Sequence, residues 1–215
     1  MEFRETLVRA GKRLLEKKLT VETWGNLSLR DPATGLVYIT PSAMAYDRIS
    51  QEDVVVMTLS GERVAGERKP TVETALHLGI YGARPEICAI VHTHPVQSLV
   101  FACLHEDIPP VIDEAAQSLG GTVRCAAYAL PGTKALAQNA LAALGKDGMA
   151  CLLANHGAVC LGRDMDEAFR TAAVLEMTAE VYRMARTLGT PKPVSAENAA
   201  YLREFMLHRY FVQKD

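Results

Sequence analysis

The beginning of the chain carries two different patterns of apolar and polar positions. Apolar residues recur every three or four positions through residues 2–18, which predicts an amphipathic helix. Residues 24–30 and 35–40 are rich in strand-forming residues and lie on either side of Asp31-Pro32. This arrangement predicts a β-hairpin.

The rest of the chain alternates between short apolar strands and helical segments. Strands are expected at 53–58, 87–92 and 123–128, and two more within 149–161. Helices are expected at 71–83, after Pro95, at 132–144, from 164 to about 189, and from 195 to about 209. Strands with helices between and around them predict an α/β layered fold. No stretch resembles a linker, so residues 1–215 are expected to form one domain.

Composition narrows the classes of protein that are possible. Of the 215 residues, 49% are hydrophobic and the formal net charge is −2, without the basic patch that nucleic-acid binding requires. The apolar runs are too short to cross a membrane, and the N-terminus lacks the features of a signal peptide. The five cysteines form no CxxC motif and are expected to be buried free thiols. A cytoplasmic protein without nucleic-acid or membrane partners is expected.

Three histidines are candidates for a metal site. His92 and His94 lie two residues apart at the end of a predicted buried strand, so their side chains point the same way. His156 lies at a predicted tight turn between two apolar strands. Each of them alone is also compatible with a packed or solvent-exposed histidine. Together they would leave one coordination position open, which is typical of a catalytic metal site.

Glu73 is the candidate acid. It falls in the first turn of the helix expected at 71–83, and His77 lies four residues further on the same face. A carboxylate there could complete the metal site and act as a general base. It could equally stabilise only the start of the helix.

Six segments in order resemble the class II aldolase/adducin family. They are TWGNLSLR, YITPSAMAYDRI, KPTVETALHLGIY, AIVHTHPV, IPPVIDEAAQSLGG and LLANHGAV. The resemblance covers almost the whole chain. It implies a central, largely antiparallel sheet with helices on both faces. It also implies a homotetramer with active sites at the subunit interfaces.

The resemblance assigns roles to the candidate residues. His92, His94 and His156 match the family's zinc ligands, although Mn²⁺, Fe²⁺ or Co²⁺ would also suit them. Glu73 matches the acid that ligates the resting metal and transfers protons in the aldolases, where the epimerases usually carry an aspartate. Tyr210 resembles a tyrosine that reaches a neighbouring subunit's site as a proton donor.

The resemblance also implies a pocket for substrate and phosphate, with some departures from the family pattern. The matching residues are Gly25, Asn26, Ser28, Thr40, Ser42, Ala43 and Thr71. Ala43 stands where a glycine is usual, and Val72 where a second serine is usual, so one phosphate contact is expected to be missing. In the fucose-type aldolases a tyrosine is expected near Asp113. The acidic side chain here could bind substrate hydroxyls, join a proton relay or simply cap a helix.

These matches imply a zinc-dependent lyase of sugar metabolism. It would reversibly cleave a ketose 1-phosphate or a related substrate through a metal-stabilised enediolate. A decarboxylase, a dehydratase or a sugar-phosphate 4-epimerase of the same fold is the alternative. A non-catalytic adducin-like module is a remote one, since all three histidines and Glu73 are present.

Overall fold

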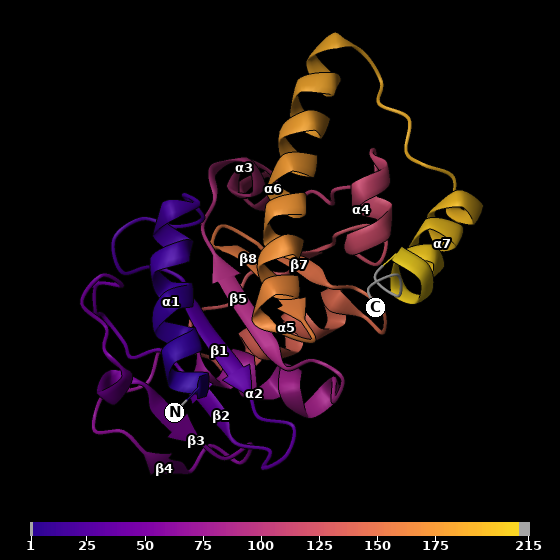
Figure 1. Ribbon diagram of the computed structural model, residues 1–215. Coiled ribbons are helices and arrows are strands. Elements are labelled where there is room, and N and C mark those ends of the chain that lie inside the picture. Colours follow the sequence, from indigo (N-terminus) through magenta and orange to yellow (C-terminus); the bar gives the residue numbers. More distant parts are fainter. Residues whose placement is uncertain (1, 211–215) are drawn as a thin grey trace.

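The strands form one mixed sheet at the centre of the molecule (Figure 1). The computed structural model describes residues 2–210 of the chain, without the side chain of Tyr210. Within this range the sheet has eight strands in the order β4-β3-β2-β1-β5-β8-β7-β6. They are β1 (Asn26–Arg30), β2 (Val37–Ile39), β3 (Val55–Met57), β4 (Arg63–Ala65), β5 (Ala89–Thr93), β6 (Cys125–Ala126), β7 (Ala150–Leu153) and β8 (Gly157–Gly162).

Neighbouring strands of this sheet are antiparallel, apart from the parallel pair β6 and β7. β5 lies at the centre between β1 and β8, which come from opposite halves of the chain. His92 on β5 is paired with Asn26 on one side and with Val159 on the other. The sheet therefore brings three distant segments of sequence to one place.

Helices cover both faces of the sheet, as expected for the α/β layered fold, which is confirmed. They are α1 (Glu2–Glu16), α2 (Thr74–Ala83), α3 (Val96–Leu104), α4 (Asp113–Ser118), α5 (Lys134–Leu144), α6 (Met165–Leu188) and α7 (Ala196–Phe205), with a 3-10 turn at Gln51–Asp53 and a π-helical turn at Met206–Tyr210. α1, α3 and α6 pack on one face, and α2 and α5 on the other (Figure 1). α7 packs against α4 beside the sheet.

The alternation of side chains along the strands separates two hydrophobic cores. In β5, Ala89 and Val91 join the core beneath α1 and α6, whereas Ile90 joins the core beneath α2 and α5. The same alternation places Leu152 in the first core and Leu153 in the second. Because both faces are covered, these strands are apolar almost throughout.

Individual elements differ from the sequence expectations. The strand expected at 123–128 is only Cys125–Ala126, and α2 begins at Thr74 with Glu73 as its N-cap. β4 was not expected, and α4 was implied only by the reading of Asp113 as a helix cap. β4 pairs with β3 at the edge of the sheet, and all three of its residues are exposed. Its sequence therefore lacks the apolar positions that would predict a strand.

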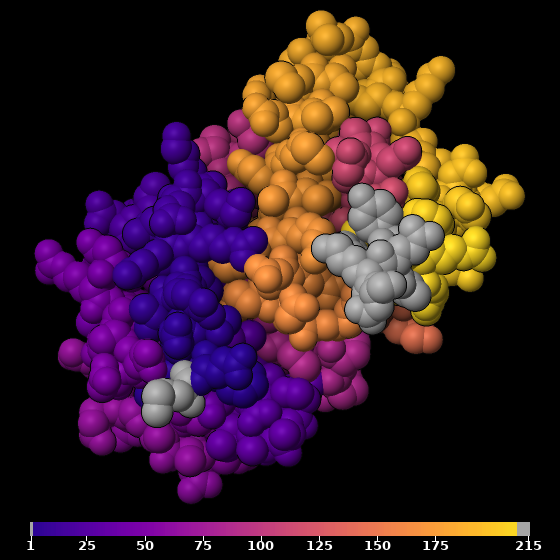
Figure 2. Space-filling model, viewed as in Figure 1, coloured from indigo at the N-terminus to yellow at the C-terminus, as the bar shows by residue number. Residues whose placement is uncertain are grey.

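The C-terminal part of α6 projects beyond the rest of the molecule (Figure 2). Exposed apolar residues follow one another along it at helical spacing, at Met177, Met184 and Leu188. Leu188 is 90% exposed. α6 is nevertheless no membrane segment, since none of the described helices is long and apolar enough to span a membrane.

The buried side of α6 should dominate its contribution to stability. Leu175 is 1% exposed, and Leu175→Ala should lower the free energy of unfolding by about 2–5 kcal/mol through lost burial and the cavity left behind. Met177→Ala, at a position 40% exposed on the same helix, should change it by less than about 0.5 kcal/mol. Chemical denaturation of both variants measures the difference, and equal losses would contradict this packing.

Candidate metal centre

Two backbone features bring the three histidines together. His92 lies in β5 and His94 just beyond its end, while His156 lies in the turn between β7 and β8. β5 and β8 are antiparallel neighbours, so the end of one strand meets the beginning of the other. Asn155 adopts a left-handed conformation with φ of 55°, which closes the turn directly before His156.

The three imidazole rings face one another closely. Their centroids are 4.7 to 5.2 Å apart, with interplanar angles of 65° to 83°. Nε2 of His94 lies 3.0 Å from Nε2 of His92. Within residues 2–210, these three offer one ligand nitrogen each within 4.8 Å of one another. This geometry is that of three ligands converging on one ion.

Glu73 lies against the histidines and is only 3% exposed. Its Oε2 is 2.9 Å from Nε2 of His92 and accepts a hydrogen bond of 2.9 Å from Nδ2 of Asn26. Its Oε1 is buried, lies 3.5 Å from Nε2 of His156 and accepts no hydrogen bond. A buried acceptor without a donor is costly, and a cation between the carboxylate and the imidazoles would satisfy it.

The protonation states suit a divalent cation. Nδ1 of His92 donates to the carbonyl of Ala158 at 2.9 Å, which leaves its Nε2 free to bind a metal. Burial, together with the nearby His92, lowers the pKa of His94 to about 3, so His94 is neutral. Burial alone would raise the pKa of Glu73, but His92 and His156 outweigh it and hold this pKa well below its usual range. Burial alone would lower the pKa of His92, but the Glu73 carboxylate in turn raises it above its ordinary value. Imidazole nitrogens beside a carboxylate are donors that zinc and similar ions take, and a bound ion would displace the proton of His92.

A cavity of about 430 Å³ opens beside this cluster. Glu73, His94 and His156 line it. Five of the predicted substrate residues also line it, namely Gly25, Asn26, Ser42, Ala43 and Thr71. Gly25 has φ of +71°, and a Cβ there would lie 2.6 Å from the His92 carbonyl oxygen, so this close approach of backbones requires glycine.

Other predicted substrate residues do not line this cavity. Ser28 is fully buried between His77 and Tyr81, and the hydroxyl of Thr40 accepts a hydrogen bond from the Leu27 amide. Asp113 begins α4, which packs against α6 and α7. The side chain of Tyr210 lies outside the described residues.

The cavity also has walls that the sequence did not indicate. Trp24 and Pro131 are apolar residues on its lining, beside Val72, which the resemblance already placed in the pocket. Pro131 comes from a segment nearly sixty residues after Glu73, so only the fold places it there. Gly132 packs so closely on the Val72 backbone that a Cβ would lie 2.8 Å from its carbonyl oxygen.

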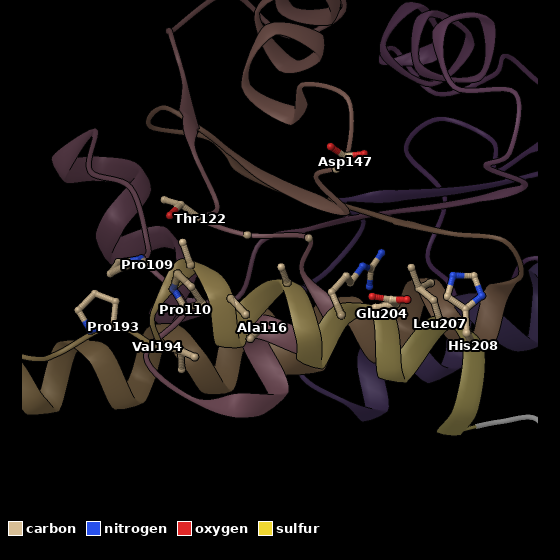
Figure 3. Close-up of a pocket in the computed structure, with 16 residues that line it drawn as sticks. Pro109, Pro110, Ala116, Thr122, Asp147, Pro193, Val194, Glu204, Leu207 and His208 are labelled. Carbon is tan, nitrogen blue, oxygen red and sulfur yellow. The ribbon is translucent and has the colours of Figure 1, made fainter.

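A larger cavity of about 630 Å³ lies elsewhere, between α7 and the segments around Pro109-Pro110 and Pro193-Val194 (Figure 3). It shares no lining residue with the histidine cavity. His208 is the single histidine on its wall, and the described residues form no metal-ligating group there. The chemistry is therefore assigned to the smaller cavity.

The fold and this centre define a class of protein, an α/β layered protein with a three-histidine metal site. The sequence model described as Class II Aldolase and Adducin N-terminal domain matches residues 5–183. The chain belongs to the class II aldolase and adducin family, as its sequence segments suggested.

Several relatives are aldolases. The chain is 40% identical over 189 residues, 88% of each protein, to 5-deoxy-D-ribulose 1-phosphate aldolase of Bacillus thuringiensis serovar kurstaki. It is 37% identical over 195 residues to 5-methylthioribulose-1-phosphate/5-deoxyribulose-1-phosphate aldolase of Rhodospirillum rubrum, covering 91% of this chain and 86% of the relative. A solved L-fuculose 1-phosphate aldolase superposes with a TM-score of 0.91 at 38% identity, covering 94% of this chain and 95% of that one. The expectation of an aldolase-like lyase is confirmed.

The centre should lose its metal when one imidazole is removed. His94→Ala should lower bound metal in the purified protein from about one ion per chain to a small fraction, because two imidazoles and a carboxylate hold a divalent ion less tightly. His208→Ala removes an exposed histidine outside the cluster and should leave the metal content unchanged. Elemental analysis measures both, and full metal content in His94→Ala would contradict the assignment.

Proposed function

We propose that this protein is a zinc-dependent aldolase that cleaves a ketose 1-phosphate. The observation that carries the proposal is a buried carboxylate, Glu73, facing three imidazoles on the wall of a cavity. His92, His94, His156 and Glu73 would hold the ion, and manganese, iron or cobalt would fit the same donors. When bound, such an ion supplies Lewis-acid stabilisation of the negative charge that forms on substrate oxygen as the carbon–carbon bond breaks.

The proposed substrate class is a 5-deoxypentulose 1-phosphate. Two relatives are named for such substrates. Trp24 and Pro131 add an apolar wall to the cavity, which suits a substrate that ends in a methyl group rather than a hydroxyl. Cleavage between C3 and C4 would release dihydroxyacetone phosphate and acetaldehyde.

Glu73 is the proposed proton carrier. During cleavage the C4 hydroxyl loses a proton and C3 gains one, so the reaction needs no net proton. Oε2 of Glu73 already accepts a hydrogen bond from Asn26, whereas Oε1 accepts none. Glu73 would be a ligand of the ion only while no substrate is bound. Once substrate displaces it, Oε1 is the atom that we assign to hold the proton delivered to C3. Tyr210 keeps its predicted role as the group that exchanges a proton with the C4 oxygen.

The phosphate would lie on the opposite side of the cavity, near Ser42 and Thr71. Both residues line the cavity and carry hydroxyl groups. The Thr71 hydroxyl accepts a hydrogen bond from the Glu73 amide at 3.4 Å, so its own proton remains for a phosphate oxygen. Val72, which is 56% exposed, adds only an apolar surface.

The proposed assembly is a homotetramer whose subunits meet at the active sites. Trp24 on the cavity wall is 58% exposed and is accompanied by exposed Val72 and Leu130. A second apolar surface runs along α6 through Met184 and Leu188. Surfaces of this kind are typical of contacts between subunits.

The cytoplasm is the proposed compartment. All five cysteines are free thiols, but the expectation that they are buried holds only for Cys151 and Cys160, and Cys103 is exposed. Burial raises the pKa of Cys151 and of Cys160 far above the usual range, so both thiols are unreactive. Unpaired, unreactive cysteines are typical of proteins in a reducing compartment.

Replacing the proton carrier should abolish turnover while leaving the metal bound. Glu73→Gln should lower kcat for 5-deoxyribulose 1-phosphate by about 10²–10⁴-fold, because the amide cannot carry the proton. Glu62→Gln, on an exposed turn, should have no effect. Coupled assays for aldehyde release, carbon dioxide release and isomer formation measure the rates. Aldehyde release by Glu73→Gln at the normal rate, or carbon dioxide or an isomer as the sole product of the unaltered protein, would refute the proposal.

Restoring a hydroxyl at position 72 should strengthen phosphate binding. Val72→Ser adds a donor on the cavity wall and should lower KM for the phosphorylated substrate by about tenfold, since a hydrogen bond to a charged group is worth about 1.5–3 kcal/mol. The matched variant Val64→Ser, on exposed β4, should leave KM unchanged. An unchanged KM in Val72→Ser would place the phosphate elsewhere.

A further inference from the structure

Behind the metal centre, five buried side chains from α2, its N-cap and β1 form one hydrogen-bonded series. Oε2 of Glu73 is 2.9 Å from Nδ2 of Asn26, and Oδ1 of Asn26 is 2.5 Å from Nε2 of His77. Nδ1 of His77 is 2.6 Å from Oγ of Ser28, which is 2.8 Å from the Tyr81 hydroxyl. All five side chains are buried.

The spacing of these residues follows from backbone geometry. Glu73, His77 and Tyr81 are four residues apart, so they lie on one face of the helix, about 6 Å apart along its axis. Asn26 and Ser28 are two residues apart on one face of the strand, separated by about 6.6 Å. Because the two repeats nearly match, each strand residue fits between two helix residues.

The charge of Glu73 sets the direction of every hydrogen bond in this series. A carboxylate only accepts, so Asn26 must present its amide nitrogen to Glu73 and its oxygen to His77. His77 must then carry its proton on Nε2 and accept from the Ser28 hydroxyl at Nδ1. Ser28 in turn accepts from the Tyr81 hydroxyl. Burial, aided by the nearby His92, lowers the pKa of His77 to about 3, in agreement with a neutral ring.

We propose that His77 is a positioning residue that holds the Glu73 carboxylate in its reactive orientation through Asn26. The inference rests on the proposed function, in which Glu73 carries the proton. An Asn side chain can turn either its nitrogen or its oxygen toward a neighbour. The donor on His77 allows only the orientation in which Asn26 donates to Glu73. Oε2 is then anchored and Oε1 is left for chemistry.

Ser28 and Tyr81 form the end of the hydrogen-bonded series that lies farthest from Glu73. In the direction that Glu73 sets, the Ser28 hydroxyl lies 2.6 Å from Nδ1 and donates to it, which agrees with a His77 tautomer that carries its proton on Nε2. The Arg30 guanidinium lies 5.6 Å from the centre of the Tyr81 ring and closes the series beyond it. Since Ser28, His77 and Tyr81 are fully buried and do not line the cavity beside the metal centre, water cannot readily replace one of them.

Two substitutions at His77 separate this role from simple packing. His77→Leu fills the space without a donor and should lower kcat about tenfold to a hundredfold, with KM little changed and metal content retained. His77→Gln offers an amide donor near the position of Nε2 and should recover most of kcat. Ile80→Ala, buried on the same helix without polar contacts, should lower stability but not kcat.

The outcomes distinguish the alternatives. Equal kcat in His77→Leu and His77→Gln would overturn the proposal. A kcat in Ile80→Ala as low as that in His77→Leu would also overturn it, because loss of stability alone would then explain the effect. Nitrogen-15 NMR of the unaltered, metal-loaded protein tests it without any variant or activity. His77 should be neutral with its proton on Nε2, and a charged ring or the other tautomer would overturn it even if the protein proves to catalyse another reaction.

Discussion

The burial of one carboxylate is the constraint on which the rest of the site depends. Glu73 is almost completely enclosed, and a charge in such a place requires partners on every side. Imidazoles from β5 and from the β7–β8 turn meet it on one side, and the amide of Asn26 on β1 meets it on the other. Helix α2 must therefore begin where these strands converge. The central position of β5 in the sheet makes this convergence possible.

As a consequence, the two faces of the sheet make different kinds of contact with their helices. Beneath α1 and α6 the strands contribute an apolar core. Beneath α2 the side chains of β1 are polar at Asn26 and Ser28, and they form a hydrogen-bonded series with α2 instead of an apolar contact. Such a buried polar series is stable only when all its members are satisfied, which makes it rigid. Rigidity there is what a site that must orient a proton carrier requires.

Much of the fold could be predicted from the sequence, because most elements have a strong pattern. The helix expected from residue 164 is α6, and its N-cap Asp164 accepts a hydrogen bond from the amide of Glu167. The elements that could not be predicted are those that form only because they pair with another strand. β4 is exposed and exists through its pairing with β3, and β6 is only two residues long beside β7. Strand order also depends on contacts between distant segments.

The sequence by itself determined which residues could hold a metal, since an HxH at a strand end, a histidine at a tight turn and a glutamate at a helix start depend on local geometry. It also placed Glu73 and His77 on one face of a helix. Only the tertiary structure decided which polar residues reach the cavity. Asn26 lines it, whereas Ser28, two residues further along the same face, lies beneath α2 and contacts His77. Strand periodicity gives the face of a side chain, but what covers that face depends on helices far away in the chain.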